Sequence, residues 1–315
     1  MNERRIDFDS AKELYQKDRE CGAVIKSPRM FGVEFEIVPN FTKIITRDGV
    51  TEIHNKTEKL VPLAWGAGHD GSVTAGGVEI QSAPMVLKKG EDTVAKFCSD
   101  VKKIGWTTDN SCGIHVHIDA NDMKAKPEHV RRLFLTYFVL DYSILAMLPT
   151  ARRANVFCAP LDATRAGKLL RHADTFYEKG WDMNKIVTTK ATRKDFLEMF
   201  YKKPLEYIPQ ELRSHYHEAR YHGVNFHTLY GGNGSVNYGT IEIRYLEGTL
   251  DADTILHWTA FHQHIIDNAR TIREVEAIEL FHTKGPKTRL KKYASLTNMP
   301  QTLVDWACGR IDMFK

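Results

Sequence analysis

The stretch from Asn110 to Asp119 constrains the fold of this chain more than any other, because polar and apolar residues alternate along its centre. His115 and His117 occupy alternate positions, and Ile114, Val116 and Ile118 stand between and beside them. Side chains of a β-strand point to opposite faces with a period of two, so both imidazoles must share one face. The stretch therefore predicts a strand with one apolar face and one face open to a ligand.

Three further stretches repeat this alternation and carry charged or polar residues on one face. They are Gly32–Ile37 with Glu34 and Glu36, Gly77–Gln81 with Glu79 and Gln81, and Thr240–Tyr245 with Glu242 and Arg244. We expect the four stretches to be strands of one sheet whose polar face binds a ligand. The alternation predicts which side chains share a face, and the pairing of the strands is a hypothesis.

Helices are predicted beside these strands. Apolar residues recur at helical spacing over Gly90–Gly105, over Pro127–Leu148 and over Asp253–Glu274, and the second stretch should pack on the back of the sheet. Residues 64–72 contain several glycines and an Asp-Gly turn signal, which predicts a loop. Gly223–Leu229 is interpreted as another strand.

The chain is divided into three parts on these patterns. We expect residues 1–28 to form a peripheral N-terminal segment, residues 29–275 to form the main domain with the alternating strands, and residues 276–315 to form a helical C-terminal tail. Within the main domain, residues 150–219 are basic and helical in pattern. We expect them to form a cap or insertion over the sheet.

The bulk composition excludes several classes of protein. The 315 residues include 44 basic and 40 acidic side chains, so the net charge of +4 is compatible with a phosphate-bearing ligand without requiring one. No basic stripe typical of nucleic-acid binding is present, and no apolar run is long enough to span a membrane. Five cysteines without a CxxC motif predict reduced thiols and a cytoplasmic location. The oligomeric state is not determined by these patterns.

The acidic stretches indicate a divalent-cation site. Two carboxylates at alternate positions of one strand repel each other unless a positive group lies between them. Glu34, Glu36, Glu79 and Glu242, together with one histidine, form a set of ligands suited to Mg²⁺ or Mn²⁺. Zn²⁺ is a further candidate, although its closed sites rarely use so many carboxylates.

Each motif taken alone also has a simpler interpretation. A Glu-x-Glu pair on a strand is usually solvated, and the two histidines could be structural. Glu242 and Arg244 could form an ion pair on the sheet, and Asp70 could serve only its Asp-Gly turn. The cation site is favoured because several such strands occur in one chain.

Taken in order, several stretches resemble the amidoligase family of the glutamine synthetase and glutamate–cysteine ligase superfamily. They are Phe31–Glu36, Asp70–Ser72 with Gly77–Pro84, Asn110–His117, Arg152–Pro160, Arg220–Asn225 and Thr240–Thr249. The resemblance extends over roughly residues 29–270. It implies an α+β fold with an antiparallel sheet of glutamine-synthetase-like catalytic type, helices packed on one face, and a helical cap.

The resemblance also implies roles for individual residues, carried over position by position. The implied metal ligands are Glu34, Glu36, Asp70, Glu79, His115 and Glu242. The implied nucleotide-binding residues are Arg220, Asn225, Arg244 and His117. Among these residues, catalysis is expected to involve Arg220, Arg244 and Glu79.

In ligases of this kind, ATP phosphorylates a carboxylate and an amine then attacks the acyl phosphate. We therefore expect an ATP- and Mg²⁺-dependent (or Mn²⁺-dependent) carboxylate–amine ligase that acts on a small-molecule or peptide acid and amine. The sequence lacks a Walker-type P-loop, which favours binding of the nucleotide through carboxylate-held metal. Three alternatives remain open: a phosphotransferase on the same sheet, a metal-dependent hydrolase, and a non-catalytic nucleotide-binding scaffold.

Overall fold

The computed structural model describes residues 27–39, 62, 64–70, 72–73, 77–153, 155–161, 222–230 and 238–315. Nearly all of the predicted peripheral segment 1–28, most of the predicted cap 150–219 and the candidate Arg220 lie outside the described residues. The chain divides into two compact units, and strand β6 (Thr240–Glu247) and helix α10 (Ala252–Asn268) contribute residues to both. The first unit comprises Met1–Ile118 and Leu246–Phe261, and the second comprises Asp119–Tyr245 and His262–Lys315. The three predicted parts of the chain stay a prediction.

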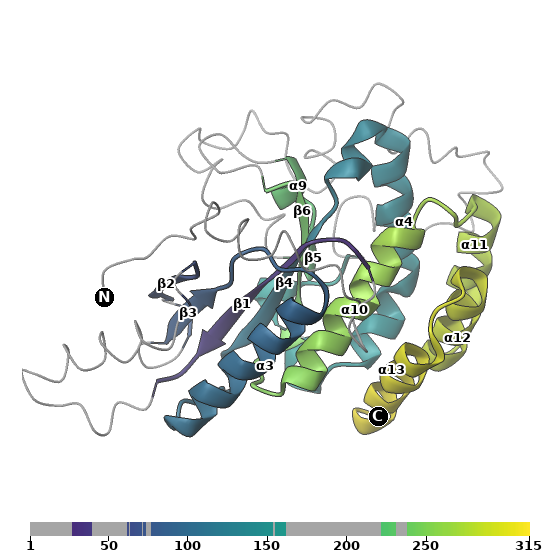
Figure 1. The fold of residues 1–315 in the computed structure, drawn as a ribbon. Helices are drawn as coiled ribbons and strands as arrows, with labels where there is room; N and C mark the ends of the chain where they lie inside the picture. The colour runs from purple at the N-terminus through teal and green to yellow at the C-terminus, as the bar shows by residue number, and fades with distance from the viewer. Residues whose placement is uncertain are drawn as a thin grey trace, which may run out of the picture. The chain divides into compact units, whose positions relative to one another are not determined.

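The first unit is built on four strands in the order β2-β3-β1-β4, and every neighbouring pair is antiparallel (Figure 1). Its elements are β1 Phe31–Ile37, β2 Gly66–His69, β3 Val78–Gln81, α3 Leu87–Lys103 and β4 Gly113–Asp119. The strands combine with helices in an α+β fold, so the predicted fold class is confirmed at that level. The finer assignment to the glutamine-synthetase-like type stays a prediction.

The register of the strands aligns their polar positions in rows. Glu34 pairs with Gln81 of β3 on one side and with His115 of β4 on the other. Glu36 pairs with Glu79 of β3. Side chains directly opposite each other in an antiparallel pair point to the same face, so all five gather on one side of these strands.

Strand β2 corrects the prediction of a loop over residues 64–72. Gly66 and Gly68 pair with Gln81 and Glu79 of β3, which supplies the backbone partners that a loop would lack. Glycine is a poor strand former, so the local pattern favours a loop even though pairing with β3 produces a strand. A methyl group added at Gly68, opposite Glu79, would meet no described atom within 4 Å.

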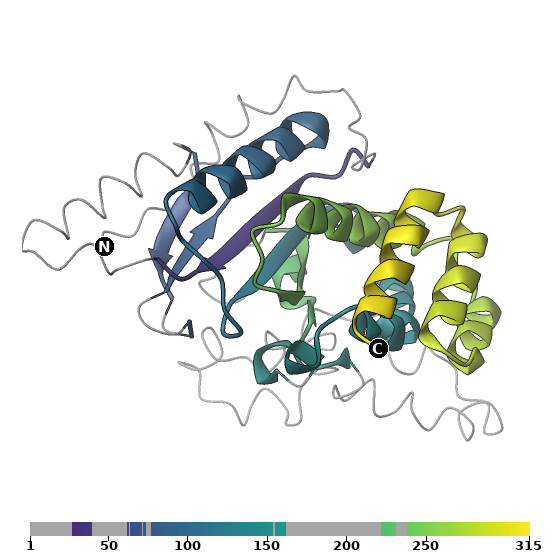
Figure 2. The same ribbon diagram turned by 90° about the horizontal axis from the view of Figure 1, so that it is seen from below.

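The apolar face of the same strands packs against α3, which runs along it (Figure 2). Phe35 of β1 contacts Trp65 and Phe97, with ring centroids 6.0 and 4.7 Å away. Gly105 ends this helix with a φ of 78°, a left-handed conformation that favours glycine. Its N–H bonds to the Lys102 carbonyl, as in a Schellman cap.

The second unit is mainly helical. Its elements, including those shared with the first unit, are η2 Asn121–Ala125, α4 Pro127–Ala146, α5 Thr150–Arg153, η3 Val156–Cys158, β5 Val224–Asn225, α9 His227–Tyr230, β6 Thr240–Glu247, α10 Ala252–Asn268, α11 Glu274–His282, α12 Pro286–Thr297 and α13 Gln301–Met313. Helices α11, α12 and α13 pack against α4 (Figure 2). Phe138 of α4 stacks on Phe281 of α11 at 5.8 Å between centroids. None of the described helices is both long and apolar enough to cross a bilayer.

Two predictions of secondary structure are wrong in this unit. The predicted strand Gly223–Leu229 is only two residues long, because the chain turns into helix α9 at His227. The helix predicted over Asp253–Glu274 ends at Asn268. A new helix follows, and its N-terminus is capped where the Arg273 N–H donates to the Glu276 carboxylate at 2.8 Å.

Candidate active site

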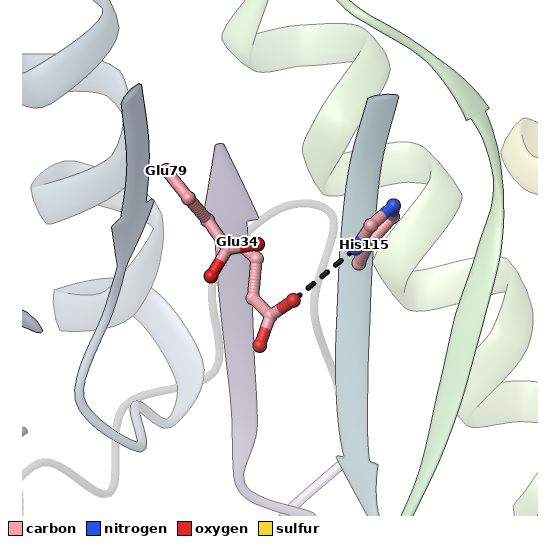
Figure 3. A group of neighbouring side chains, drawn as sticks. All are labelled: Glu34, Glu79 and His115. Carbon is pink, nitrogen blue, oxygen red and sulfur yellow. Dashed lines mark hydrogen bonds and ion pairs between the residues drawn. The ribbon is translucent and has the colours of Figure 1, made fainter. Parts of the chain in front are cut away.

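Five of the predicted metal ligands converge on the polar face of the first unit. They are Glu34, Glu36, Asp70, Glu79 and His115, which we call the acidic cluster. Ligand atoms of Glu34, Glu79 and His115 lie within 4.8 Å of one another, and so do those of Glu36, Asp70 and Glu79. Figure 3 shows Glu34 between Glu79 and His115, with the side chain of Glu79 reaching toward Glu34 and the Glu34 carboxylate turned toward His115. Glu79 belongs to both groups and therefore joins them.

The two histidines contact the carboxylates from strand β4. His115 is only 3% exposed, and its two ring nitrogens face different acids. Its Nδ1 lies 3.2 Å from Glu34 Oε2, and its Nε2 lies 3.3 Å from Glu36 Oε1. His117 Nε2 lies 3.2 Å from the other oxygen of Glu34. Because Glu34 has a histidine at each of its oxygens, it is the best compensated acid of the acidic cluster.

The pKa of Glu34 reflects this compensation. Burial alone would raise the pKa of its carboxyl group. The charge of His117 and the hydrogen bonds of both histidines outweigh burial and hold the pKa of Glu34 well below its ordinary value. The carboxyl group of Glu34 therefore favours its charged form, which suits a cation ligand.

The pKa of Glu79 shifts in the opposite direction. Burial raises it first, and the negative charges of Glu34, Asp70 and Glu36 raise it further. Only the hydrogen bond from Gln81 opposes these effects, so the pKa of Glu79 lies well above its ordinary value. Such crowding of carboxylates is the repulsion that a bound divalent cation relieves.

Gln81 lies on the polar face, as its alternation with Glu79 predicts, but the sequence does not indicate a role for it. Its Nε2 donates to Glu79 Oε1 at 2.5 Å and lies 3.5 Å from Glu34 Oε1. It therefore connects the two acids whose pKa values move apart. The usable signal is its position two residues after Glu79, on the same strand face.

Asp70 shapes its turn and also lies in the acidic cluster, two interpretations that the sequence presents as alternatives. Its Oδ1 accepts hydrogen bonds from the N–H and the hydroxyl of Ser72, each at 2.7 Å, so it does shape the turn. A carboxylate oxygen of Asp70 also lies within the group formed with Glu36 and Glu79. The turn thus orients Asp70 for a place in the acidic cluster.

A second group of predicted residues lies within the second unit. Asn225 of β5 pairs with Glu242 of β6, and its Nδ2 donates to Glu242 Oε2 at 2.7 Å. Arg244 Nη1 forms an ion pair with Glu242 Oε1, so the ion pair considered as an alternative is present. Glu242 is 4% exposed. A common site with the acidic cluster stays a prediction for these three residues.

The ligand atoms of the acidic cluster suit a hard cation. They are carboxylate oxygens with one imidazole nitrogen, and Mg²⁺ and Mn²⁺ favour carboxylate oxygens. The carboxylates lie against one another, where positive charge at the centre would offset their repulsion. The residues present therefore fit the divalent cation that the resemblance implies.

Comparison with known proteins finds a match over the part of the chain that contains Asp70, Glu79 and His115. A family model described as "putative amidoligase enzyme" matches residues 54–266, which is more than half of the chain. The match includes strands β2, β3, β4 and β6 and begins after β1, which carries Glu34 and Glu36. A search among curated proteins found no match to this chain.

Proposed function

Because this chain belongs to the amidoligase family, we propose that it is an ATP-dependent ligase that joins the carboxylate of one substrate to the amine of another. The family match by itself indicates an enzyme of the ligase type. The dependence on ATP and on Mg²⁺ or Mn²⁺ belongs to our proposal. The observation that carries it is the convergence of four carboxylates and one histidine in the first unit.

The acidic cluster would hold the cation through Glu34, Glu79 and His115, through Glu36, Asp70 and Glu79, or through both groups. A divalent cation bound there would neutralise charge that develops on the phosphates during transfer. Glu34 contributes a fixed negative charge.

In the proposed reaction, an oxygen of the acid attacks the γ-phosphorus of ATP, and the bond from that phosphorus to ADP breaks. The amine nitrogen then attacks the carbonyl carbon of the acyl phosphate, phosphate leaves with the bonding electrons, and the nitrogen loses a proton. Arg244 and Arg220 would bind phosphate oxygens, because a guanidinium group can donate to two oxygens at once. Asn225 would keep Glu242 in place, and His117 would contact the nucleotide from β4.

The proposal is tested by measuring ADP and phosphate over a panel of acids and amines, with and without EDTA. We expect both products to form in equal amounts, and only when acid, amine, ATP and cation are all present. A stably phosphorylated product without phosphate release would instead identify a phosphotransferase. Turnover without nucleotide would identify a hydrolase, and nucleotide binding without any turnover would favour a scaffold. Each of these three outcomes would contradict the ligase.

A binding measurement tests the cation site independently of activity. After treatment with EDTA, added Mn²⁺ should raise the melting temperature of the protein, because a ligand that binds the folded state stabilises it. Glu79→Gln should remove this increase. Glu91→Gln is the matched control, since Glu91 is a glutamate of the same unit that is 5% exposed and lies on α3. An equal response of both variants to Mn²⁺ would place the cation elsewhere.

A further inference from the structure

Arg152 of α5 is a buried arginine whose hydrogen bonds go to the main chain of β6. It is 5% exposed. Its Nε donates to the Tyr245 carbonyl at 3.1 Å, and its Nη2 donates to the Arg244 carbonyl at 2.7 Å. The rigid fork of a guanidinium group fixes the distance between two acceptors that it binds together. Arg152 therefore holds the backbone of β6 where Arg244 is attached.

The same short segment also contacts the side chain of Arg244. The Phe157 carbonyl accepts a hydrogen bond from Arg244 Nε at 3.3 Å. Phe157 is itself held by Asn155, whose Oδ1 accepts from the Phe157 N–H at 2.8 Å. The Cys158 thiol lies 3.5 Å from the Arg152 carbonyl, which ties the two ends of the segment together. Arg152 thus contacts the main chain of Arg244, and Phe157 contacts its guanidinium group.

The main-chain N–H of Arg244 also has a hydrogen-bond partner, because it donates to the Gly223 carbonyl at 2.7 Å. Gly223 packs so closely on the ring of Tyr245 that an added Cβ would lie 1.8 Å from a ring carbon. The Tyr245 hydroxyl donates to Asp141 of α4 at 2.5 Å, which fixes that ring. Both polar groups of the Arg244 main chain therefore have rigid partners.

We propose that Arg152 is a positioning residue for Arg244, acting through the main chain of β6. This inference rests on the proposed function, in which Arg244 binds phosphate. Arg244 Nη1 pairs with Glu242 and its Nε bonds to Phe157, so the plane of its guanidinium group is set by two contacts. A shift of β6 would move Glu242 together with Arg244, but it would break the contact of Nε with Phe157, which lies outside the strand. Catalysis by positioning is sensitive to displacements of about 1 Å.

Arg153 provides a matched comparison for Arg152. It is the next residue, and it also donates to main-chain carbonyls, at 2.8 Å to Leu148 and at 2.5 Å to Phe314. These carbonyls belong to the end of the α4 region and to the end of the chain, and Arg153 has no described hydrogen bond to β6. Replacing either arginine removes a guanidinium group that holds main chain, but only Arg152 holds Arg244.

The experiment compares Arg152→Met with Arg153→Met. Both variants should melt at lower temperature than the wild type. At a temperature where all three proteins are folded, we expect Arg152→Met to raise the KM for ATP or lower kcat by at least about tenfold, with Arg153→Met near the wild type. Arg152→Lys, which keeps one donor group, should lie between them. Wild-type kinetics in folded Arg152→Met, or equal losses in both Met variants, would overturn the inference.

A second measurement separates this inference from the proposed function. The Nε–H of Arg244, assigned by comparison with Arg244→Lys in ¹⁵N NMR spectra, should exchange slowly with water in the wild type and in Arg153→Met. It should exchange at least about tenfold faster in Arg152→Met, because the Phe157 contact is lost. This result would support the positioning role even if no substrate pair gave turnover. Unchanged protection in Arg152→Met would contradict the role even in an active ligase.

Discussion

The charged groups of the acidic cluster in the first unit and three arginines of the second unit have opposite kinds of partner. In the first unit, half-buried carboxylates such as Glu34 and Glu79 face one another, and His115 and His117 both contact Glu34. In the second unit, Arg152, Arg289 and Arg310 bind main-chain carbonyls. A charge whose partners are backbone groups stabilises the fold, whereas like charges held together oppose it. The comparison therefore separates residues that hold the structure from residues arranged for a ligand.

The largest effect is expected for Glu79, where a substitution tests whether the acidic cluster serves a ligand rather than the fold. Glu79→Gln should lower ligase turnover by roughly 100-fold or more, because a bound cation contributes several kcal/mol to the transition state. In EDTA its free energy of unfolding should stay the same or rise, since Glu79 is repelled by neighbouring acids. ADP release and urea unfolding provide the two measurements. A clear loss of stability with full activity would show that Glu79 is structural.

Arg289 should show the reverse behaviour. Its guanidinium group donates to the Val139 carbonyl at 2.9 Å and to the Phe281 carbonyl at 2.7 Å, which connects α12 to α4 and α11. Arg289→Met leaves these carbonyls without that donor and should cost about 2–3 kcal/mol of unfolding free energy. Turnover at low temperature should not change. Urea unfolding with a parallel activity assay checks both, and a selective loss of activity would contradict the structural role.

A pH-dependent effect of about the same size is expected at His262 in the second unit. The ring is fully buried beside Tyr137, and burial lowers the pKa of His262 to about 3. In the unfolded chain His262 binds a proton below about pH 6.5, whereas in the folded protein it does so only near pH 3. The contribution of His262 to the free energy of unfolding is therefore complete above pH 6.5 and declines as the pH falls toward 3. At pH 5 the free energy of unfolding should be lower by roughly 2 kcal/mol.

The control is His262→Gln, unfolded in urea over the same pH range. The difference in unfolding free energy between wild type and variant should shrink as the pH falls from 6.5. A difference that does not vary with pH would mean that His262 titrates normally in the folded state.

The smallest effect is expected from charges exposed to solvent. Lys88 of α3 pairs with Asp92 at 2.5 Å and has a half-exposed side chain. Such pairs contribute little, because water screens the charges and the side chains lose freedom. Lys88→Ala should change neither the melting temperature nor turnover within the error of the measurement. A measurable loss would show that surface charge contributes to the first unit.

The sequence predicts features that depend on local periodicity. Glu34 and His115 lie on one face because alternation is a property of each strand by itself, and the structure pairs them across β1 and β4. The edge strand with Gly66 and Gly68 was missed, because its stability comes from pairing with β3 rather than from its own residues. The antiparallel register that brings Glu36 opposite Glu79 is equally a long-range property.

The role of Arg152 was also beyond the sequence. Its partners are carbonyl groups, which every residue possesses, so no pattern of side chains marks them. Gln81 illustrates a milder case, because its face was predictable and its two acidic partners were not. Glu242 and Arg244 were expected on one strand face, and the structure adds Asn225 as a hydrogen-bond partner of Glu242.

One described stretch ends at Leu161, whose N–H donates to the Asp141 carboxylate at 2.9 Å, and the next begins at His222. Ala159 and His222 form a parallel bridge, and the Gly223 N–H bonds to the Ala159 carbonyl at 2.9 Å. Residues 159 and 222, far apart in the sequence, are thus bonded to each other, so β5 starts from an anchored backbone and carries Asn225 to Glu242.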